Sequence, residues 1–243
     1  MHAAAGAGFT SFSLWTFWAT RYGTERTRAL FDSVGVGVGA VEAVTQWVNG
    51  PSIDLDAEIT ATAEVATILG ADTVLACTLE PSLLSPDAAA AGFRSLCEQA
   101  ATRDLRVCIE FFPWSGMSDL ATAWRVVEES GAANGGIVID MMHWHHQDGG
   151  PNFALLEQIP GERIHYVQVC DTVPPRAPAG DYMQEALANR RLPGEGAVDI
   201  ERLLGTLDAI GADPWFAYEV FNQEFASHGP ETMASRLAAC RFR

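Results

Sequence analysis

Short apolar segments alternate with longer amphipathic segments along most of this chain, and this alternation restricts the folds available to it. The apolar segments have the length of strands and the amphipathic segments the length of helices, so the pattern predicts repeated βα units. We predict strands at Phe9–Trp15, Val36–Val44, Thr73–Cys77, Arg106–Phe111, Gly136–Asp140, His165–Val169 and Trp215–Val220. We predict helices at Thr24–Ser33, Ile53–Leu69, Pro86–Thr102, Ser118–Ser130, Asn152–Gln158 and Ile200–Ile210.

The predicted strands are apolar on both faces, which is typical of a parallel sheet covered by helices. Such a sheet is either a barrel or an open doubly wound sheet. An open dinucleotide-binding sheet carries a Gly-rich turn between its first strand and the next helix, whereas the Gly-rich run Gly35–Gly39 precedes a strand. We therefore predict an α/β fold of the TIM type, a (β/α) barrel, and the length fits one such domain over residues 1–243.

The pattern yields seven strands, whereas a complete barrel of this type has eight. Residues Met1–Gly8 read like the tail of a helix that leads into a strand. We therefore expect the barrel wall to be incomplete or distorted near the N-terminus, and a regular eighth parallel strand would contradict this expectation. The connection over 171–197 is long and rich in Pro and Gly, and we interpret it as a substrate loop.

Composition excludes several classes of partner. The net charge of −16 opposes nucleic-acid binding, because phosphate contacts need a basic face. No apolar run approaches the roughly 18 residues that cross a bilayer, and the N-terminal stretch lacks the basic start and apolar core of a secretory signal. We expect a cytoplasmic protein with a small-molecule substrate and without membrane or nucleic-acid partners, and we leave a homo-oligomer open.

The cysteines lack paired metal-type spacing, and we interpret them as core residues: Cys77, Cys97, Cys108, Cys170 and Cys240.

Four polar side chains lie at or near the ends of four successive predicted strands: Glu110, Asp140, Gln168 and Glu219. A carboxylate in an apolar strand is costly to bury unless it is paired or bound to a cation. A lone strand glutamate or glutamine is more often a structural hydrogen-bonding group, but four such positions would converge at the carboxyl mouth of a barrel. Their oxygen atoms suit Mg²⁺, Mn²⁺ or Co²⁺, and Zn²⁺ also accepts carboxylates. We therefore predict a divalent metal site.

Five segments carry a family resemblance: Ile109–Phe111, Asp140–Trp144, Val167–Asp171, Arg191–Gly196 and Tyr218–Phe221. In their order and spacing they resemble the xylose isomerase-like barrel superfamily of sugar phosphate isomerases and epimerases, from about Val36 to Phe225. The resemblance implies a metal held by Glu110, Asp140, Gln168 and Glu219. Many epimerase-like members have His at the third place, whereas Gln is similar to the dehydratase branch, which includes 3-dehydroshikimate and inosose dehydratases. This departure favours dehydration over simple ketose epimerisation.

His143 follows Asp140 by three residues, so it lies within reach of a metal-bound substrate. An imidazole suits a general acid or base, and the family pattern also places a functional His here, although a purely orienting role is equally open. We interpret His145 and His146 as loop residues in a polar stretch. His165 begins its strand, so we place it at the opposite end of the barrel in a structural role.

Further substrate contacts are expected from two loops. Arg191 precedes a Leu-Pro-Gly turn that could aim its guanidinium at a substrate carboxylate or hydroxyl, and Arg190 is the alternative for this role. We expect Glu195 of the same turn to contact substrate as well. Trp114 and Trp144 follow Glu110 and Asp140 and are candidate pocket walls.

The resulting hypothesis is a metal-dependent isomerase, epimerase or dehydratase that removes a proton next to a carbonyl group and forms an enediolate. Glu110 and Glu219 are the candidate bases, and His143 would help a hydroxyl leave in a dehydratase. Two other classes remain as alternatives. One is a non-catalytic barrel subunit, and the other is an abasic-site endonuclease, which expects extra His ligands and a basic DNA face.

Overall fold

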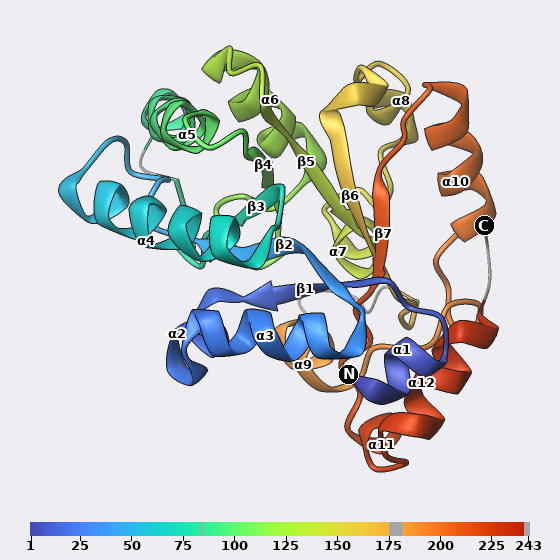
Figure 1. Ribbon diagram of the computed structural model, residues 1–243. Coiled ribbons are helices and arrows are strands. Elements are labelled where there is room, and N and C mark those ends of the chain that lie inside the picture. The colour runs from blue at the N-terminus through green and yellow to red at the C-terminus, as the bar shows by residue number, and fades with distance from the viewer. Residues whose placement is uncertain (84, 175–181, 241–243) are drawn as a thin grey trace.

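The computed structural model describes residues 1–83, 85–174 and 182–240. In this part of the chain one sheet of seven parallel strands runs in sequence order from β1 to β7. The strands are β1 (Ser11–Trp15), β2 (Gly37–Val44), β3 (Thr73–Ala76), β4 (Arg106–Ile109), β5 (Gly135–Asp140), β6 (Ile164–Val169) and β7 (Trp215–Tyr218). The sheet curls into a nearly closed barrel (Figure 1), as the βα rhythm predicts.

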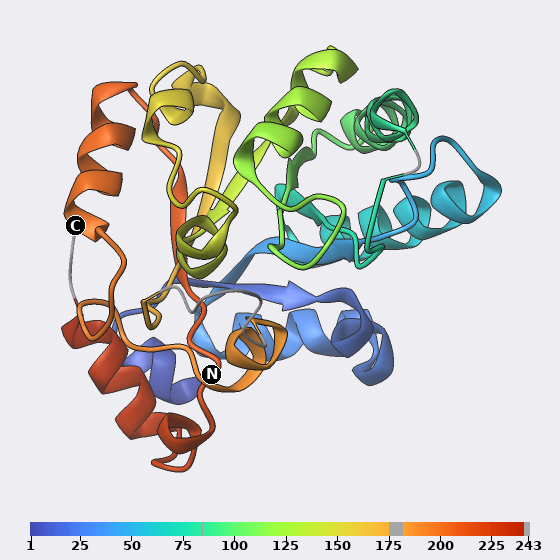
Figure 2. The same cartoon turned by 180° about the vertical axis from the view of Figure 1, so that it is seen from behind.

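Helices follow most strands and lie outside the sheet (Figures 1 and 2). They are α1 (His2–Gly6), α2 (Thr16–Tyr22), α3 (Thr24–Val34), α4 (Ile53–Leu69), α5 (Pro86–Ala101), α6 (Leu120–Ser130), α7 (Met141–His146), α8 (Phe153–Leu156), the 3₁₀ turn η1 (Gly161–Arg163), α9 (Tyr182–Ala188), α10 (Ile200–Ala209), α11 (Gln223–Ala226) and α12 (Pro230–Ala239). None of the described helices is both long and apolar enough to cross a membrane.

Local sequence sets the start of the long outer helices. The side chains of Ser52, Ser85 and Asp119 accept hydrogen bonds from the backbone N–H groups of Leu55, Ala88 and Thr122, and so they cap α4, α5 and α6. Such caps satisfy amide groups that have no partner inside the helix. Helix α9 was not predicted, and it lies within the connection over 171–197 that we interpreted as a substrate loop. Residues 175–181 of that loop lie outside the described residues.

The barrel wall is incomplete between its first and last strands, as predicted. No pairing between β1 and β7 occurs in the described part of the chain, where the sheet has seven strands. Side chains cover this gap instead: the ring of Phe9, just before β1, and that of Tyr218 in β7 meet at 89° with centroids 5.7 Å apart. Helices α1 and α12 lie side by side over the same region in both views (Figures 1 and 2).

Two apolar layers form the core. The larger one lies between the sheet and the outer helices, and it contains Trp47, Phe93 and Leu120. The smaller one fills the barrel interior, where Tyr166 of β6 stacks on Trp215 of β7 at 4.5 Å between centroids. Four of the cysteines are buried as free thiols, which confirms their reading as core residues, while Cys240 is half-buried.

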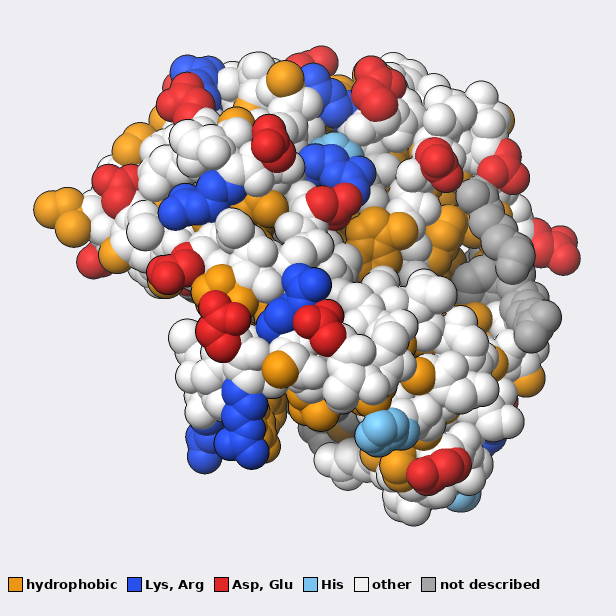
Figure 3. Space-filling view, viewed as in Figure 1, with side chains coloured by type: hydrophobic (Ala, Val, Ile, Leu, Met, Phe, Trp, Pro, Cys, Tyr) orange, Lys and Arg blue, Asp and Glu red, His pale blue; other side chains and the backbone are white. Residues whose placement is uncertain are grey.

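Charged side chains of both signs are interspersed on the outer surface seen in Figure 3, where Asp and Glu are spread over several helices. The distribution agrees with the 31 acidic and 15 basic residues of the sequence.

The Trp215 ring requires a residue without a side chain at Gly39 of β2. A Cβ atom at Gly39 would lie 2.4 Å from Cζ2 of Trp215, whereas one at Gly37 in the same strand would have no heavy atom closer than 3.8 Å. We predict that Gly39→Ala lowers the free energy of unfolding by about 1–3 kcal/mol through overpacking, while Gly37→Ala changes it little. Urea unfolding of both variants measures the difference.

The Trp215→Phe substitution supplies the control, because it removes the atoms that would clash. In a double-mutant cycle it should recover much of the stability that Gly39→Ala loses. Equal stability of the two alanine variants would contradict this packing.

Candidate functional site

The four predicted strand-end residues all lie at the carboxyl rim of the barrel. Glu110 follows β4 directly, Asp140 is the last residue of β5, Gln168 is the penultimate residue of β6 and Glu219 follows β7. The strands are parallel and adjacent from β4 to β7, so these ends share one rim. Glu110, Asp140 and Gln168 are buried, and the Glu219 side chain is 15% exposed.

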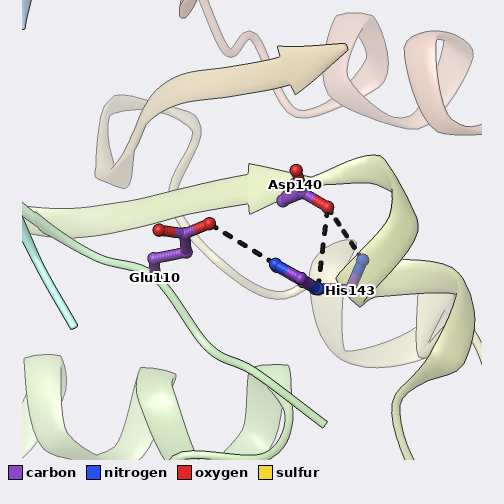
Figure 4. A group of neighbouring side chains, drawn as sticks. All are labelled: Glu110, Asp140 and His143. Carbon is purple, nitrogen blue, oxygen red and sulfur yellow. Dashed lines mark hydrogen bonds and ion pairs between the residues drawn. The ribbon is translucent and has the colours of Figure 1, made fainter. Parts of the chain in front are cut away.

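His143 is placed by the helix that Asp140 begins. Oδ1 of Asp140 accepts a hydrogen bond of 2.9 Å from the backbone N–H of His143 and so caps α7. The imidazole then lies between two carboxylates, with Nε2 3.6 Å from Oε1 of Glu110 and Nδ1 3.8 Å from Oδ1 of Asp140 (Figure 4). Single ligand atoms of these three residues lie within 4.8 Å of one another, a spacing that could hold a metal ion.

Arg190 is the buried cation of the site. Its Nη1 forms an ion pair with Oδ2 of Asp140 and a second, 3.0 Å long, with Oε2 of Glu219. Its guanidinium lies over the ring of Phe221, 5.6 Å from the centroid. The sequence favours Arg191 for a role at the site, with Arg190 as the alternative, whereas the structure places Arg190 among the predicted metal ligands.

Arg190 is positioned by a loop folded around one carboxylate. The Asp171 side chain accepts hydrogen bonds from the backbone N–H groups of Gly194, Gly196 and Val198, at 2.9–3.0 Å. The backbones of Asp171 and Arg191 also exchange two hydrogen bonds. These hydrogen bonds to Asp171 hold the segment from Arg191 to Gly196 in place, and with it the backbone of the preceding residue, Arg190.

Burial and the closeness of other charged groups shift the pKa values of the acidic side chains at the rim. Burial, followed by the negative charges of Glu219 and Asp140, raises the pKa of Glu110 well above its usual value. Burial also raises the pKa of Glu219, to about 8, although Arg190 opposes this. At Asp140 burial is again the largest effect and acts in the same direction, but the charges of Arg190 and His143 together with the hydrogen bonds from both residues outweigh it, so the pKa is lowered. Burial lowers the pKa of His143 to about 4, so this imidazole is neutral at pH 7.

The donor set fits a divalent cation. Both polar atoms of the Gln168 amide are buried and have no hydrogen-bond partner, which is costly unless a ligand or ion completes their bonding. The carboxylates of Glu110, Asp140 and Glu219 outnumber the one guanidinium beside them. Oxygen ligands and surplus negative charge are the features that Mg²⁺, Mn²⁺ or Zn²⁺ would satisfy. Glu110 and Asp140 belong to both the predicted ligand set and the cluster with His143.

A cavity of about 470 Å³ opens at this rim. Its polar lining includes Glu42, Glu110, His143, Arg190 and Glu219. Its apolar walls come from separate segments of the chain, namely Trp15, Phe17, Leu75, Cys77, Leu79, Phe112, Trp114, Met183, Leu187 and Phe221. The volume is that of a small-molecule site.

Several predicted residues do not share this cavity. Trp114 lines it as expected, but Trp144 is buried in the outer core against Phe153, with centroids 5.2 Å apart. The first turn of α7 directs Trp144 away from the rim. Arg191 and Glu195 line a separate depression of about 160 Å³, where Arg191 donates to the Glu195 carbonyl.

The reading of His145 and His146 as loop residues was wrong. Both lie in α7 and are buried, because Asp140 starts a helix in a segment too polar to predict one. Nε2 of His146 lies 2.9 Å from the Thr172 hydroxyl, which hydrogen-bonds to Glu185 of α9. His165 is buried beside Gly136 at the amino-terminal end of the sheet, as expected of a structural residue.

Sequence reasoning missed Glu42, a buried carboxylate of β2 that also lines the cavity. The criterion that found Glu110, a carboxylate inside an apolar strand, applies equally to Val41-Glu42-Ala43.

Comparison with known proteins agrees with this architecture. The profile of the family described as xylose isomerase-like TIM barrel matches residues 1–241. The chain belongs to this family. A solved structure described as that of the IOLI protein with a binding zinc atom superposes with a TM-score of 0.82 at 20% identity, covering 98% of this chain and 89% of that one. This similarity shows a shared fold.

Two curated relatives of the barrel are enzymes. The 3-dehydroshikimate dehydratase of Pseudomonas aeruginosa is 34% identical over 167 residues, which cover 65% of this chain and 24% of that protein. The inosose isomerase of Bacillus velezensis is 29% identical over 132 residues, which cover 54% of this chain and 45% of that protein. The match thus spans less than half the length of each of these two relatives.

The ion pairs of Arg190 yield a matched test. We predict that Arg190→Met lowers the free energy of unfolding by about 3–5 kcal/mol, because it leaves Asp140 and Glu219 buried without their cation. The same change at the neighbouring, exposed Arg191 should cost no more than about 0.5 kcal/mol. Chemical unfolding measures both, and a similar loss at the two positions would refute the assigned role of Arg190.

The raised carboxyl pKa values predict a pH dependence of the metal-free protein. Glu219 titrates near 8 in the folded state and near its ordinary value of 4.5 when unfolded, so the folded protein binds its proton more tightly. The stabilisation is complete below pH 4.5 and is lost as the pH rises through 8. With a chelator present, the melting temperature should fall between pH 5 and pH 8, and Glu219→Gln should flatten the slope. Identical slopes would contradict the shift.

Proposed function

We propose that this barrel is a divalent-metal-dependent dehydratase or isomerase that acts on a small polyhydroxylated carbonyl compound through an enediolate. The observation that carries the proposal is the convergence of Glu110, Asp140, Gln168 and Glu219 on one rim, with surplus negative charge beside a small-molecule cavity. The names of the two curated relatives support the substrate class, because dehydroshikimate and inososes are both hydroxylated six-membered cyclic ketones.

The ion would be held by Glu110, Asp140, Gln168 and Glu219. When bound, it would polarise the substrate carbonyl group and stabilise negative charge that develops on its oxygen. Mn²⁺, Mg²⁺, Co²⁺ and Zn²⁺ all suit this donor set.

The chain's own residues would move the protons. Glu110 and Glu219 come from β4 and β7, which are separated by β5 and β6, so their carboxylates approach a bound ring from different sides. One of them removes the proton next to the carbonyl group, which forms the enediolate. In an isomerase the other returns a proton to the substrate.

In a dehydratase a hydroxyl group must leave instead, and it needs a proton to depart as water. Nε2 of His143 lies 3.6 Å from Oε1 of Glu110, so a small approach of the two side chains around a bound substrate would let His143 pass the proton on to the leaving hydroxyl. Arg190 keeps Asp140 ionised and fixes Glu219, while Phe112 and Trp114 exclude water from this side of the cavity.

The test is turnover by purified protein loaded with Mn²⁺, with 3-dehydroshikimate and an inosose as substrates. Loss of water from 3-dehydroshikimate gives an aromatic dihydroxybenzoate and loss of water from an inosose gives a conjugated carbonyl compound, so dehydration changes the ultraviolet spectrum in both cases, and isomerisation is seen by product analysis. Glu219→Gln should lower turnover by roughly 10²-fold or more, because it removes a proton-transfer group. Glu195→Gln, in the separate depression, serves as the matched control.

Three results would contradict the proposal. They are full activity of Glu219→Gln, turnover that persists in the presence of a chelator, and a melting temperature that no divalent ion raises.

A further inference from the structure

Glu42 is a buried acid of the cavity that the proposed reaction does not use. It lies near the carboxyl end of β2, is 6% exposed and lines the same cavity as Glu110 and Glu219. A carboxyl group in such a position needs either a structural or a ligand-binding reason, because its burial is costly.

The neighbouring strand β1 satisfies only part of the hydrogen-bonding capacity of the Glu42 carboxyl group. The Ser13 hydroxyl of β1 donates to Oε1 of Glu42, and the Trp15 side chain also hydrogen-bonds to the group. A carboxylate offers about four acceptor positions, so acceptor capacity remains toward the cavity. The backbone of Glu42 is fixed separately, because the Thr16 hydroxyl donates to its carbonyl oxygen at 3.0 Å.

The charge of the cavity disfavours an acidic ligand. Among its described lining residues, Arg190 is the one Arg or Lys side chain, and its ion pairs with Asp140 and Glu219 already occupy it. This guanidinium and one divalent ion together would balance three of the four carboxylates of Glu42, Glu110, Asp140 and Glu219. An uncharged ligand avoids the repulsion that remains.

An aromatic wall of the same cavity favours a ring with an apolar face. Phe112 and Trp114 stack with centroids 5.3 Å apart and planes within 9° of parallel, and both line the cavity. The indole N–H of Trp114 is buried and has no hydrogen-bond partner in the described structure. A cyclic polyol could lay its C–H face on this wall and offer an oxygen to the indole.

We propose that Glu42 is a further substrate-contacting residue, which accepts a hydrogen bond from a ligand hydroxyl and makes the cavity select an uncharged polyhydroxylated cyclic ketone over one that carries a carboxylate. This inference rests on the proposed function, because it concerns the ligand of the same site. Hydroxyl groups donate to carboxylates in strong hydrogen bonds, whereas a second carboxylate at this place is repelled.

The test compares two probes of similar ring size, an inosose without charge and 3-dehydroshikimate with a carboxylate. Their dissociation constants are measured by calorimetry on Mn²⁺-loaded protein. We expect the wild-type protein to bind the inosose more tightly. Glu42→Gln should weaken inosose binding roughly tenfold or more and shrink the preference over 3-dehydroshikimate, because it removes the charge.

Ser13→Ala is the control that separates a ligand contact from a structural tie. It removes the hydrogen bond to β1 but keeps the carboxylate, so it should lower the melting temperature and retain the preference. Should Glu42→Gln fail to fold, Glu42→Asp replaces it: the shorter acid should lose affinity for the inosose and still reject the acidic probe.

The proposal is overturned if Glu42→Gln keeps the wild-type preference, if wild-type protein prefers 3-dehydroshikimate, or if it binds neither probe. Failure of the proposed function looks different. It would appear as a melting temperature that Mn²⁺ does not raise and as turnover that survives Glu219→Gln, whatever residue 42 is.

Discussion

The crowding of three buried acidic side chains around one guanidinium at one rim of the barrel is the constraint on which the site depends. Asp140, Glu110 and Glu219 lie together with one guanidinium, that of Arg190, which pairs with two of them. The result is unequal carboxyl groups: the pKa of Asp140 is lowered, while those of Glu110 and Glu219 are raised. When the pKa values of neighbouring groups are pushed apart, one group is protonated and the other ionised at the same pH, as proton-transfer chemistry requires.

The scaffold holds this charge by fixing its partners from several elements. Asp140 begins α7 and thereby positions His143. Asp171 accepts hydrogen bonds from three backbone N–H groups within 194–198 and so holds the segment next to Arg190 in place. These contacts are hydrogen bonds to charged groups in a buried place, where they are stronger than in water. The site is therefore preorganised by side chains that do not themselves line the cavity, Asp171 among them.

The barrel interior limits the cavity from below. Side chains two residues apart on a strand point to the same face, so Gln168 lies one layer above Tyr166. The stacked rings of Tyr166 and Trp215 close the interior beneath the polar rim, and Gly39 provides the room they need. The cavity above these rings combines acidic groups with aromatic side chains in its lining, and a hydroxylated ring with an apolar face would fit this environment.

The sequence by itself determined the βα order, the seven strands, the gap in the wall and the strand-end positions of Glu110, Asp140, Gln168 and Glu219. These follow from local periodicity and from the rule that parallel strands end at one rim. The sequence did not determine which side chains from other segments of the chain reach this rim. The roles of Arg190 rather than Arg191 and of Glu42 from β2 depend on contacts across 50 and 29 positions of sequence, respectively, and the outward direction of Trp144 depends on the helix that Asp140 begins. Only the tertiary structure decides such contacts, because the field and hydrogen bonds that select them come from residues remote in the chain.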